Sequence, residues 1–411
     1  MDARRMLSTL AALAETANAT PGNGVTRFSW SSADKAARTL LAGELEAMGL
    51  APWTDGIGNM HAVYPGTEKG PRVIIGSHLD TVRFGGRLDG TLGVVAALEA
   101  LRSLHDEGLR PVRDIEFIAF AEEEGSNYGC TCLGSKAAMG MVGPEDLKSL
   151  RNAQGSCYDA LRAFGLEPDA LPGQRIDSAD VHAFLELHIE QNARLEQAGR
   201  RLGVVTSICG MRLRRVTLSG KSDHAASPMQ GRRDPMAGFA EFAHRMEGLW
   251  KQGTLPEDFS CTIGSISCSP DVGIIIPSSV TFTVDLRHVD RDTLEQGWDI
   301  LEKLLLGIAE ERGLECRVDL LSASGGSRMD AGVQEAFIQA ARGRGEEPML
   351  LPSGPAHDAA AFGASGIPTG MLFVPSIGGL SHCPEENTAE EDLLLGAQVL
   401  EDALRALAGA Q

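Results

Sequence analysis

The sequence lacks the features that mark membrane proteins, disulfide-stabilised secreted domains and nucleic-acid-binding proteins. No apolar run approaches the roughly 20 residues that a helix needs to cross a bilayer. The eight cysteines include no CxxC pair, and a chain of 411 residues needs no disulfide framework, so we expect reduced thiols and a cytoplasmic location. With 37 basic and 56 acidic residues, the formal charge of −19 argues against nucleic acid or an anionic membrane as a partner.

The N-terminus has two interpretations. Two arginines precede an apolar segment, and residues 17–19 (Ala-Asn-Ala) resemble a signal-peptidase site. Apolar residues nevertheless recur at helical spacing in this segment: Leu7, Leu10 and Ala14. We therefore predict a first amphipathic helix rather than a signal peptide.

The chain is longer than one hydrophobic core usually organises, so we expect two domains. Short apolar runs start at Val73 and Ile115 and surround Phe184, and polar clusters bound each of them, which is typical of buried strands. Residues 31–49 and 90–101 have helical patterns, the first preceded by possible capping residues and stopped by Gly49. This alternation predicts an α/β catalytic domain with a mostly parallel sheet flanked by helices.

The pattern changes to alternating strands between about Cys209 and Ser324. In the segment 280–288, Phe282, Val284 and Leu286 face one way, and the residues between them, including Arg287, face the other. A second strand is expected over residues 212–218 and a helix over residues 235–250. This pattern predicts an inserted, smaller α+β domain at residues 209–324, with residues 1–208 and 325–411 forming the catalytic domain.

Five short motifs contain the residue types that bind divalent metals. They are GSHLD (76–80), RLDG (87–90), AEEEG (121–125), ELHIEQ (186–191) and SHCPEE (381–386). Three of them follow predicted strands, and ligands in open α/β sheets bind at the carboxyl ends of strands. The motifs can therefore supply two carboxylates and three imidazoles to one crevice: His78, Asp89, Glu124, His188 and His382.

Such a set can hold two cations about 3.5–4 Å apart and lower the pKa of a bound water from about 15.7 towards about 7. Asp89 is the natural bridge, because a carboxylate has two oxygens. Asp80 lies two residues after His78 and is placed to accept the other N–H of that imidazole. Glu123 is the candidate general base, since it shares the crevice without being needed as a ligand.

The motifs GSHLDTV, GGRLDG, AEEEGS, LGSK, ELHIEQ, HAASPM, VDLRH and SHCPEE, in this order, resemble the M20 metallopeptidase superfamily, specifically its hydantoinase/carbamoylase branch. The resemblance implies one metal bound by His78, Asp89 and His188. It implies a second metal bound by Asp89, Glu124 and His382, and Glu123 as the base.

The same resemblance implies that the smaller domain forms a homodimer. His224 would reach the active site of the partner subunit and act as an oxyanion donor. Gln191, Arg287 and His357 would contact substrate. Arg287 also has a physical argument of its own, because its planar guanidinium suits a substrate carboxylate, although an ion pair with a neighbouring aspartate is the alternative.

The chain departs from the family pattern around the substrate. Ile274 stands where an asparagine commonly helps to hold the substrate carboxylate, and Asp223 precedes His224. Asn127 and Tyr128 follow the AEEEGS motif in place of the common Arg-Phe. The other histidines, namely His61, His105, His182, His244 and His288, are expected to be structural or surface residues.

The sequence therefore predicts a binuclear amidohydrolase that cleaves a linear C–N bond of an N-carbamoyl or ureido acid and releases ammonia and carbon dioxide. Allantoate and N-carbamoyl-L-amino acids are the leading substrates. The mixed nitrogen and oxygen ligands suit zinc, manganese, cobalt or nickel. The alternatives are an N-acyl amino acid or dipeptide hydrolase, and a catalytically silent metal-binding homologue.

Overall fold

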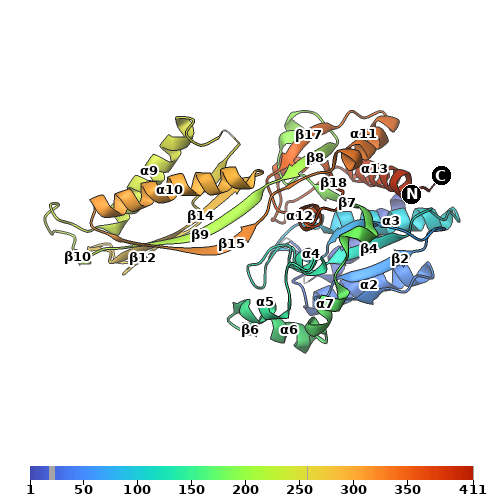
Figure 1. Ribbon diagram of the computed structural model, residues 1–411, viewed down its shortest axis with the longest axis horizontal. Helices are drawn as coiled ribbons and strands as arrows, with labels where there is room; N and C mark the ends of the chain where they lie inside the picture. The colour runs from blue at the N-terminus through green and yellow to red at the C-terminus, as the bar shows by residue number, and fades with distance from the viewer. Residues whose placement is uncertain (18–23, 257, 411) are drawn as a thin grey trace. The chain divides into compact units, whose positions relative to one another are not determined.

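The computed structural model describes residues 1–17, 24–256 and 258–410 (Figure 1). The chain divides into two compact units, a larger one formed by Met1–Ile208 and Ser327–Gln411 and a smaller one formed by Cys209–Gly326. Among the helices of the described residues, none is both long enough and apolar enough to cross a membrane. The cysteines of the described residues are not joined in disulfides.

The larger unit is built on a nine-stranded sheet with the order β1-β2-β4-β3-β7-β18-β8-β16, and β17 pairs with β8. The central strands β4, β3, β7 and β18 run parallel. Strand β2 pairs antiparallel with β4, and β8 pairs antiparallel with β18 but parallel with β17. The predicted α/β fold with a mostly parallel central sheet is confirmed. The strands are β1 Trp53–Thr54, β2 Met60–Tyr64, β3 Arg72–His78, β4 Ile115–Phe120, β7 Val181–Ile189, β8 Gly203–Ile208, β16 Ser327–Arg328, β17 Met349–Ser353 and β18 Thr369–Val374.

Helices cover both faces of this sheet, because successive residues of its central strands point into two different cores. On β3, Val73 and Ile75 belong to one core and Ile74 to the other. The first core is covered by α1 Ala3–Thr16, α2 Ser32–Ala47, α3 Thr91–Asp106, α11 Ala331–Gly343 and α13 Glu390–Ala408. The second core lies under α12 Ala359–Ala364 and the end of α4 Leu133–Ala138.

Shorter elements complete the larger unit. They are α5 Pro144–Ser149, β5 Arg151–Asn152, β6 Gly155–Ser156, α6 Cys157–Phe164, η1 Pro168–Ala170, α7 Leu171–Gln174, η2 Ser178–Asp180, α8 Arg194–Gln197 and η3 Ile377–Gly379. Most of them follow β4, where a satellite core includes Leu147, Leu161 and Leu171.

The predicted N-terminal helices are confirmed, with a shift in the face that is buried. Helix α1 buries Met6, Leu10 and Leu13, whereas Leu7 and Ala14 are only half-buried. Residues 18 and 19 of the sequence that resembles a signal-peptidase site lie outside the described residues. Helix α2 starts after Ser31, whose hydroxyl accepts the N–H of Asp34, as its capping pattern predicts.

The smaller unit has an antiparallel five-stranded sheet with the order β11-β14-β9-β15, and β12 also pairs with β14. Phe282, Val284 and Leu286 of β14 are fully buried, whereas the residues that alternate with them, including Arg287, are half-buried. This confirms the prediction that only one face of the strand is buried. The elements are β9 Gly210–Ser219, β10 Asp223–His224, α9 Pro235–Lys251, β11 Ser260–Thr262, β12 Ile266–Ser269, β13 Ile275–Ile276, β14 Ser279–His288, α10 Arg291–Glu311 and β15 Glu315–Ser324.

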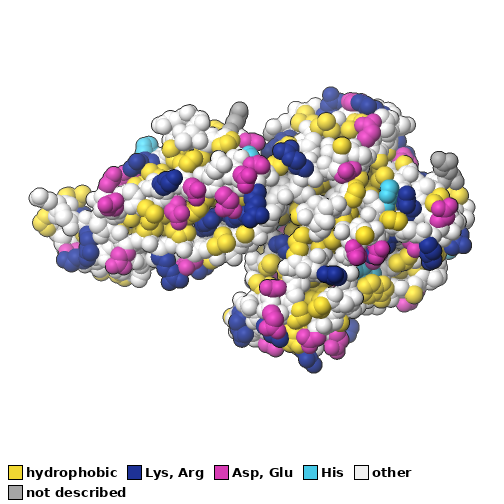
Figure 2. Space-filling model, viewed as in Figure 1, with side chains coloured by type: hydrophobic (Ala, Val, Ile, Leu, Met, Phe, Trp, Pro, Cys, Tyr) yellow, Lys and Arg dark blue, Asp and Glu magenta, His cyan; other side chains and the backbone are white. Residues whose placement is uncertain are grey.

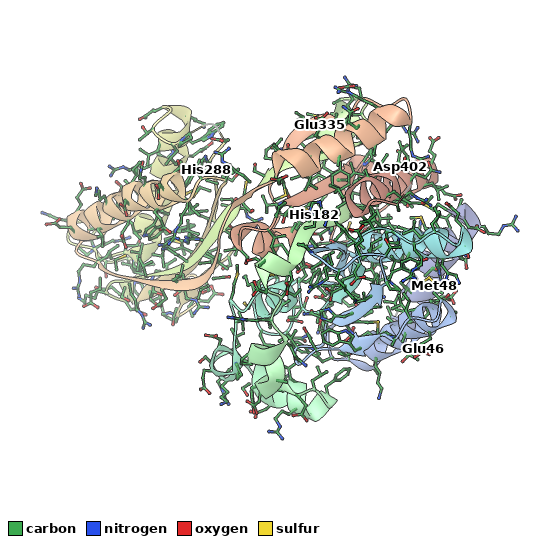
Figure 3. All side chains as sticks on the ribbon, turned by 45° about the vertical axis from the view of Figure 1, so that its right-hand side comes forward. Glu46, Met48, His182, His288, Glu335 and Asp402 are labelled. Atoms are coloured by element: carbon green, nitrogen blue, oxygen red, sulfur yellow. The ribbon has the colours of Figure 1, made fainter. Side chains whose placement is uncertain are left out.

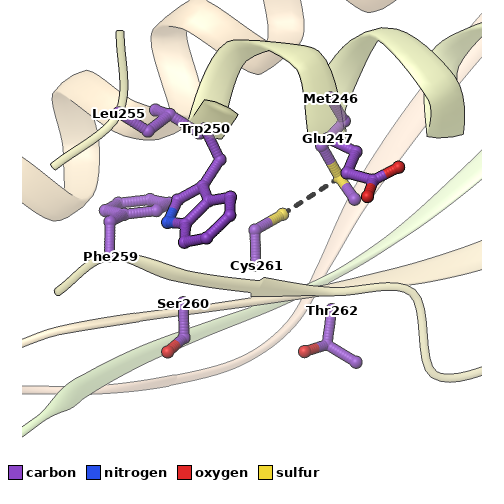
Figure 4. A pocket seen from close by; sticks show the side chains of 8 residues that line it. All are labelled: Met246, Glu247, Trp250, Leu255, Phe259, Ser260, Cys261 and Thr262. Carbon is purple, nitrogen blue, oxygen red and sulfur yellow. Dashed lines mark hydrogen bonds between the residues drawn. The ribbon is translucent and has the colours of Figure 1, made fainter. Parts of the chain in front are cut away.

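Acidic and basic side chains are interspersed on the face shown in Figure 2 rather than separated by sign. In the smaller unit, a pocket of about 450 Å³ lies between α9 and β11 (Figure 4). Its lining mixes apolar and polar side chains: Met246, Glu247, Trp250, Leu255, Phe259, Ser260, Cys261 and Thr262.

Candidate metal centre

The predicted ligands lie where parallel strands of the larger unit end. His78 is the last residue of β3, and His188 is the last but one of β7. Glu124 follows β4, which runs parallel to β3, so all three reach the same edge of the sheet. Asp89 stands just before Gly90, the N-cap of α3. His382 lies in the loop after β18, so five sequence-distant ligands lie around one edge.

His78, Asp89 and His188 form a fully buried group of possible ligands. Asp89 Oδ1 lies 3.1 Å from His188 Nε2 and 3.4 Å from His78 Nε2, and the two Nε2 atoms are 3.4 Å apart. Each Nδ1 faces a main-chain carbonyl, that of Asp80 at 3.0 Å and that of Ile189 at 2.8 Å. Because Nδ1 of each neutral ring must then carry the proton, both Nε2 lone pairs face Asp89, an arrangement that a cation stabilises.

Gly90 makes this close approach possible. Its φ of +62° is in the left-handed region, and a Cβ at this position would overlap the His78 ring. Its N–H donates to His188 Nε2 over 3.2 Å, which also requires an unprotonated Nε2. The glycine of the RLDG motif is therefore needed to pack Asp89 against both imidazoles.

Asp89, Glu124 and His382 form the second group. His382 Nε2 lies 3.1 Å from Asp89 Oδ2 and 3.2 Å from Glu124 Oε2. Glu124 Oε1 is buried without a hydrogen-bond partner, and such an atom normally has a ligand. The two oxygens of Asp89 thus face different groups, as expected of a bridging carboxylate.

The residues present therefore fit two divalent cations. Each group offers mixed imidazole nitrogen and carboxylate oxygen donors, which suit transition metals. Burial opposes the ionisation of Asp89, but the hydrogen bonds that His188, His382 and His78 donate to it when they are protonated hold its pKa well below the usual range. The bridging carboxylate is consequently in its charged, metal-binding form.

Asp80 has a different contact from the one predicted. The Nδ1 atom of His78 is 3.0 Å from the main-chain carbonyl of Asp80 and 3.9 Å from its carboxylate. That carboxylate instead accepts the backbone N–H groups of Glu123 at 3.0 Å and Glu124 at 3.2 Å. Asp80 therefore holds the segment that carries the predicted base and a predicted ligand.

Glu123 lies beside the ligand groups but belongs to neither. Its Oε2 is 4.0 Å from His78 Nε2, and its Oε1 accepts a hydrogen bond from the thiol of Cys132 over 3.1 Å. Burial and the nearby charges of Glu124 and Asp358 raise the pKa of Glu123 well above its ordinary value, although His78 and Cys132 oppose this. Local sequence patterns do not reveal the contact of Cys132 with Glu123, because it depends on the turn between β4 and α4.

Gln191 reaches the bridging carboxylate. Its Nε2 donates to Asp89 Oδ2 over 2.9 Å and lies 3.3 Å from Ser381 Oγ, while its Oε1 is buried without a partner. Gln191 and His382 have φ angles of +56° and +57°, which non-glycine residues seldom adopt. Such strain tends to persist where the surrounding structure fixes a functional geometry.

His357 lies behind the first group. Its ring centroid is 4.5 Å from that of His188, and its Nε2 is 2.9 Å from Ser353 Oγ. Burial and the charge of His188 hold the pKa of His357 well below its ordinary value, so this ring is neutral. The structure places it against a ligand, and its contact with substrate stays a prediction.

The remaining predicted site residues belong to the smaller unit. His224 is exposed, and its Nδ1 accepts the N–H of Ala226 over 3.0 Å. Ile274 is 67% exposed and its carbonyl accepts the N–H of Ala225, so it lies next to His224. The guanidinium of Arg287 contacts the Asp285 carboxylate at 3.0 Å, which is the ion pair considered as its alternative role.

The other histidines lie outside both groups. His182, at the start of β7, and His288, at the end of β14, are marked in Figure 3. His61 is buried on β2, where its Nδ1 is 2.8 Å from Glu116 and its Nε2 is 3.5 Å from Asp55.

Two buried residues that sequence reasoning missed hold the ligand segments from behind. The guanidinium of Arg27, 1% exposed, donates to the carbonyls of Leu79 and Leu13 and to the hydroxyl of Thr91. Glu386, 3% exposed, accepts the backbone N–H groups of Leu88 and Asp89. Glu386 belongs to the SHCPEE motif, but only its position in the fold reveals the contact.

Known proteins share this architecture. The peptidase family M20/M25/M40 matches residues 74–406. An N-carbamoyl-L-amino acid amidohydrolase of Geobacillus stearothermophilus is 36% identical over 384 residues, which are 92% of each chain. An allantoate amidohydrolase of Bacillus subtilis (strain 168) is 36% identical over 393 residues, 95% of this chain and 94% of that protein.

A solved amidase of the hydantoinase/carbamoylase family from Burkholderia multivorans superposes with a TM-score of 0.88. It has 31% sequence identity and covers 99% of this chain and 98% of its own. The match therefore includes both units and all the segments that carry the ligand groups. The chain belongs to peptidase family M20/M25/M40 and, within it, groups with the hydantoinase/carbamoylase amidases.

Proposed function

We propose that the protein is a homodimeric, binuclear metal-dependent amidohydrolase. It cleaves the linear C–N bond of an N-carbamoyl or ureido acid and releases ammonia and carbon dioxide. The observation that carries the proposal is the sharing of Asp89 by two ligand groups, beside a buried carboxylate that belongs to neither. The amidohydrolase names of the relatives favour this chemistry over peptide hydrolysis.

His78, Asp89 and His188 would hold one cation, and Asp89, Glu124 and His382 the other. When bound, the two divalent cations would lower the pKa of a water molecule and polarise a substrate carbonyl. Zinc, manganese, cobalt and nickel all suit this donor set.

Glu123 acts as the general base. Because Cys132 donates to Oε1, Oε2 is the oxygen left to take a proton from water and deliver it to the leaving nitrogen. Asp80 keeps this carboxylate in place through the backbone of residues 123 and 124.

His224 supplies the oxyanion donor from the partner subunit. The backbone N–H of Ala226 donates to Nδ1 of His224, so the neutral ring carries its proton on Nε2. Nε2 is the ring nitrogen that is not used in this contact with Ala226. An exposed Nε2–H suits a group that must reach a carbonyl oxygen in another subunit.

The smaller unit has surfaces that suit a dimer contact. The outer edges of β11 and β12 pair with no strand among the described residues, and an unpaired edge can form hydrogen bonds with a strand of another chain. Trp250, 50% exposed, and Ile266, 48% exposed, lie on α9 and β12, and Trp250 also lines the pocket in Figure 4. These features support the homodimer.

Subunit mixing tests the dimer and the two roles together. A mixture of Glu123→Gln and His224→Ala chains forms heterodimers with one intact site, because each site takes its base and its oxyanion donor from different chains. Random mixing should recover roughly a quarter of wild-type turnover, since half of the dimers are mixed and each has one working site of two. No recovery, with mixed dimers verified by mass, contradicts the shared site.

Arg287 and Gln191 would hold the acid end of the substrate. Ile274 cannot form a side-chain hydrogen bond, so its position beside His224 favours a substrate that meets an apolar surface there. His357 would contribute from behind His188.

A substrate panel decides the reaction. Allantoate, ureidoglycolate, N-carbamoyl-L- and D-amino acids, N-carbamoyl-β-alanine and N-acetyl amino acids should be tested after chelation and reloading with each metal separately. The proposal expects ammonia release from a carbamoyl or ureido acid. Turnover of acyl amino acids or dipeptides alone indicates the other M20 activity, and metal binding without turnover of any amide indicates a silent homologue.

A further inference from the structure

Glu386 joins two loops that are far apart in the sequence. Its Oε1 accepts the backbone N–H of Leu88 at 2.9 Å and that of Asp89 at 3.0 Å. Its Oε2 lies 2.9 Å from the hydroxyl of Ser381, the residue before His382. One buried side chain therefore connects the segment that carries Asp89 to the segment that carries His382.

The position of Glu386 depends on its neighbours. A Cβ at Gly86 would overlap the Glu386 carboxylate, although the backbone of Gly86 does not have a positive φ. Residue 86 must therefore be glycine for the carboxylate to approach. The same two loops also meet where Arg87 Nη2 donates to Asn387 Oδ1 over 3.2 Å.

The contact acts mainly on one side of Asp89. The Ser381 hydroxyl lies between two carboxylates, 3.0 Å from Asp89 Oδ2 and 2.9 Å from Glu386 Oε2. Oδ2 is the oxygen that faces His382 and Glu124, whereas Oδ1 faces the two buried imidazoles. Those imidazoles are fixed independently by the carbonyls of Asp80 and Ile189.

We propose that Glu386 is a positioning residue for the second ligand group, because it joins the loops of Asp89 and His382 and so sets the distance between them. The inference rests on the proposed two-metal function. The first cation would be held by His78 and His188, whose positions do not depend on Glu386. The affinity for the second cation would depend on Glu386.

The matched variants are Glu386→Ala and Glu385→Ala. Glu385 is exposed and adjacent, so its variant has the same charge change without loss of the buried contacts. Glu386→Gln is the conservative variant. Its carbonyl can still accept both N–H groups, and its amide can donate to Ser381, leaving the hydroxyl proton for Asp89 Oδ2.

The test is stepwise titration of the metal-depleted protein with Mn²⁺ or Zn²⁺ against a competing chelator, with thermal unfolding measured in parallel. Glu386→Ala should bind one equivalent as the wild type does and the other about 10–100-fold more weakly, the usual cost of losing an outer partner of a ligand. Glu386→Gln and Glu385→Ala should titrate like the wild type.

Gly86→Ala gives a second route if Glu386→Ala fails to fold, because it displaces the carboxylate without removing a polar group. Gly70→Ala is its control, since a Cβ there meets nothing within 4 Å. Gly86→Ala should weaken the same single equivalent.

The inference is wrong if folded Glu386→Ala or Gly86→Ala binds both equivalents like the wild type, or loses both equally. Neither result affects the proposed function, which fails instead if the wild-type chain binds fewer than two equivalents or turns over no carbamoyl or ureido acid. A wild-type chain that binds only one equivalent overturns both proposals.

Discussion

The two ligand groups share Asp89 but are held in different ways. In the first group, both imidazoles stand at strand ends, are 1% exposed and have their second nitrogen against a main-chain carbonyl. In the second group, His382 is on a loop, its side chain is 48% exposed and its φ is positive. The first group is therefore buried and held by regular structure, whereas the second includes a loop residue that is partly open to solvent.

The largest expected effect is on a residue that belongs to neither group. Glu123→Gln should lower kcat by up to about 10⁴-fold, because the amide cannot take the proton from water. Both cations should still bind, since Glu123 is no ligand. Steady-state kinetics and metal analysis of the purified variant check this, and a near-normal rate removes Glu123 as the base.

His224→Ala should lower kcat by about 10²–10³-fold, the usual cost of losing one oxyanion donor. Metal content should not change, because the ligands all lie in the larger unit. Asp223→Asn is a useful control, since Asp223 Oδ1 accepts the backbone N–H of His224 and the amide oxygen of asparagine can accept it too. A loss of metal in the His224 variant would contradict the assigned role.

The comparison between the groups is tested most directly by removing one imidazole from each. His382→Ala should weaken one cation roughly 100-fold or more, above the 10–100-fold cost of losing an outer partner, and leave the other in place. His188→Ala should weaken the cation of the first group and, unlike His382→Ala, should lower the melting temperature as well. The reason is that it leaves a cavity against His357 and Phe373. Metal titration and calorimetry distinguish the two, and identical behaviour would remove the difference between the groups.

The smallest effect lies away from both groups, on β2. Burial opposes the charge of His61, but hydrogen bonds with Asp55 and Glu116 outweigh it and raise the pKa from 6.5 to about 9. Arg72 also contacts Glu116. The pKa of His61 is higher in the folded than in the unfolded chain, so protonated His61 stabilises the fold. This contribution is complete below about pH 6.5 and is lost as the pH rises through about 9.

His61→Gln should therefore remove roughly 3 to 4 kcal/mol of this pH-dependent stability, because the pKa rises from 6.5 to about 9 and each pKa unit corresponds to about 1.4 kcal/mol. Urea unfolding at pH 6.5 and pH 10 measures it, with exposed His105→Gln as the control. Both cations should bind as in the wild type. Equal pH dependence in the two variants would show that His61 is not the group responsible.

The predictions from sequence were most accurate for buried, regular segments. The strands from Val73 and Ile115 and the helix after Gly90 follow from apolar patterns, because both sides of a buried strand must be apolar. The buried face of α1 was misplaced, since only the packing partner decides between two adjacent apolar faces. Asp80 was placed on His78 by its spacing, but the turn after β3 gives that contact to the main-chain carbonyl.

The candidate ligand set follows from the sequence alone, because His78, Asp89, Glu124, His188 and His382 stand in motifs made of the residue types that bind divalent metals. The sequence also determined the parallel order that takes their strands to one edge. Which oxygen of Asp89 faces which group, and which side chains hold the ligand segments, can be seen only in the folded chain. Glu386, Cys132 and Arg27 act through contacts between segments far apart in the chain, and local patterns contain no information on such distances.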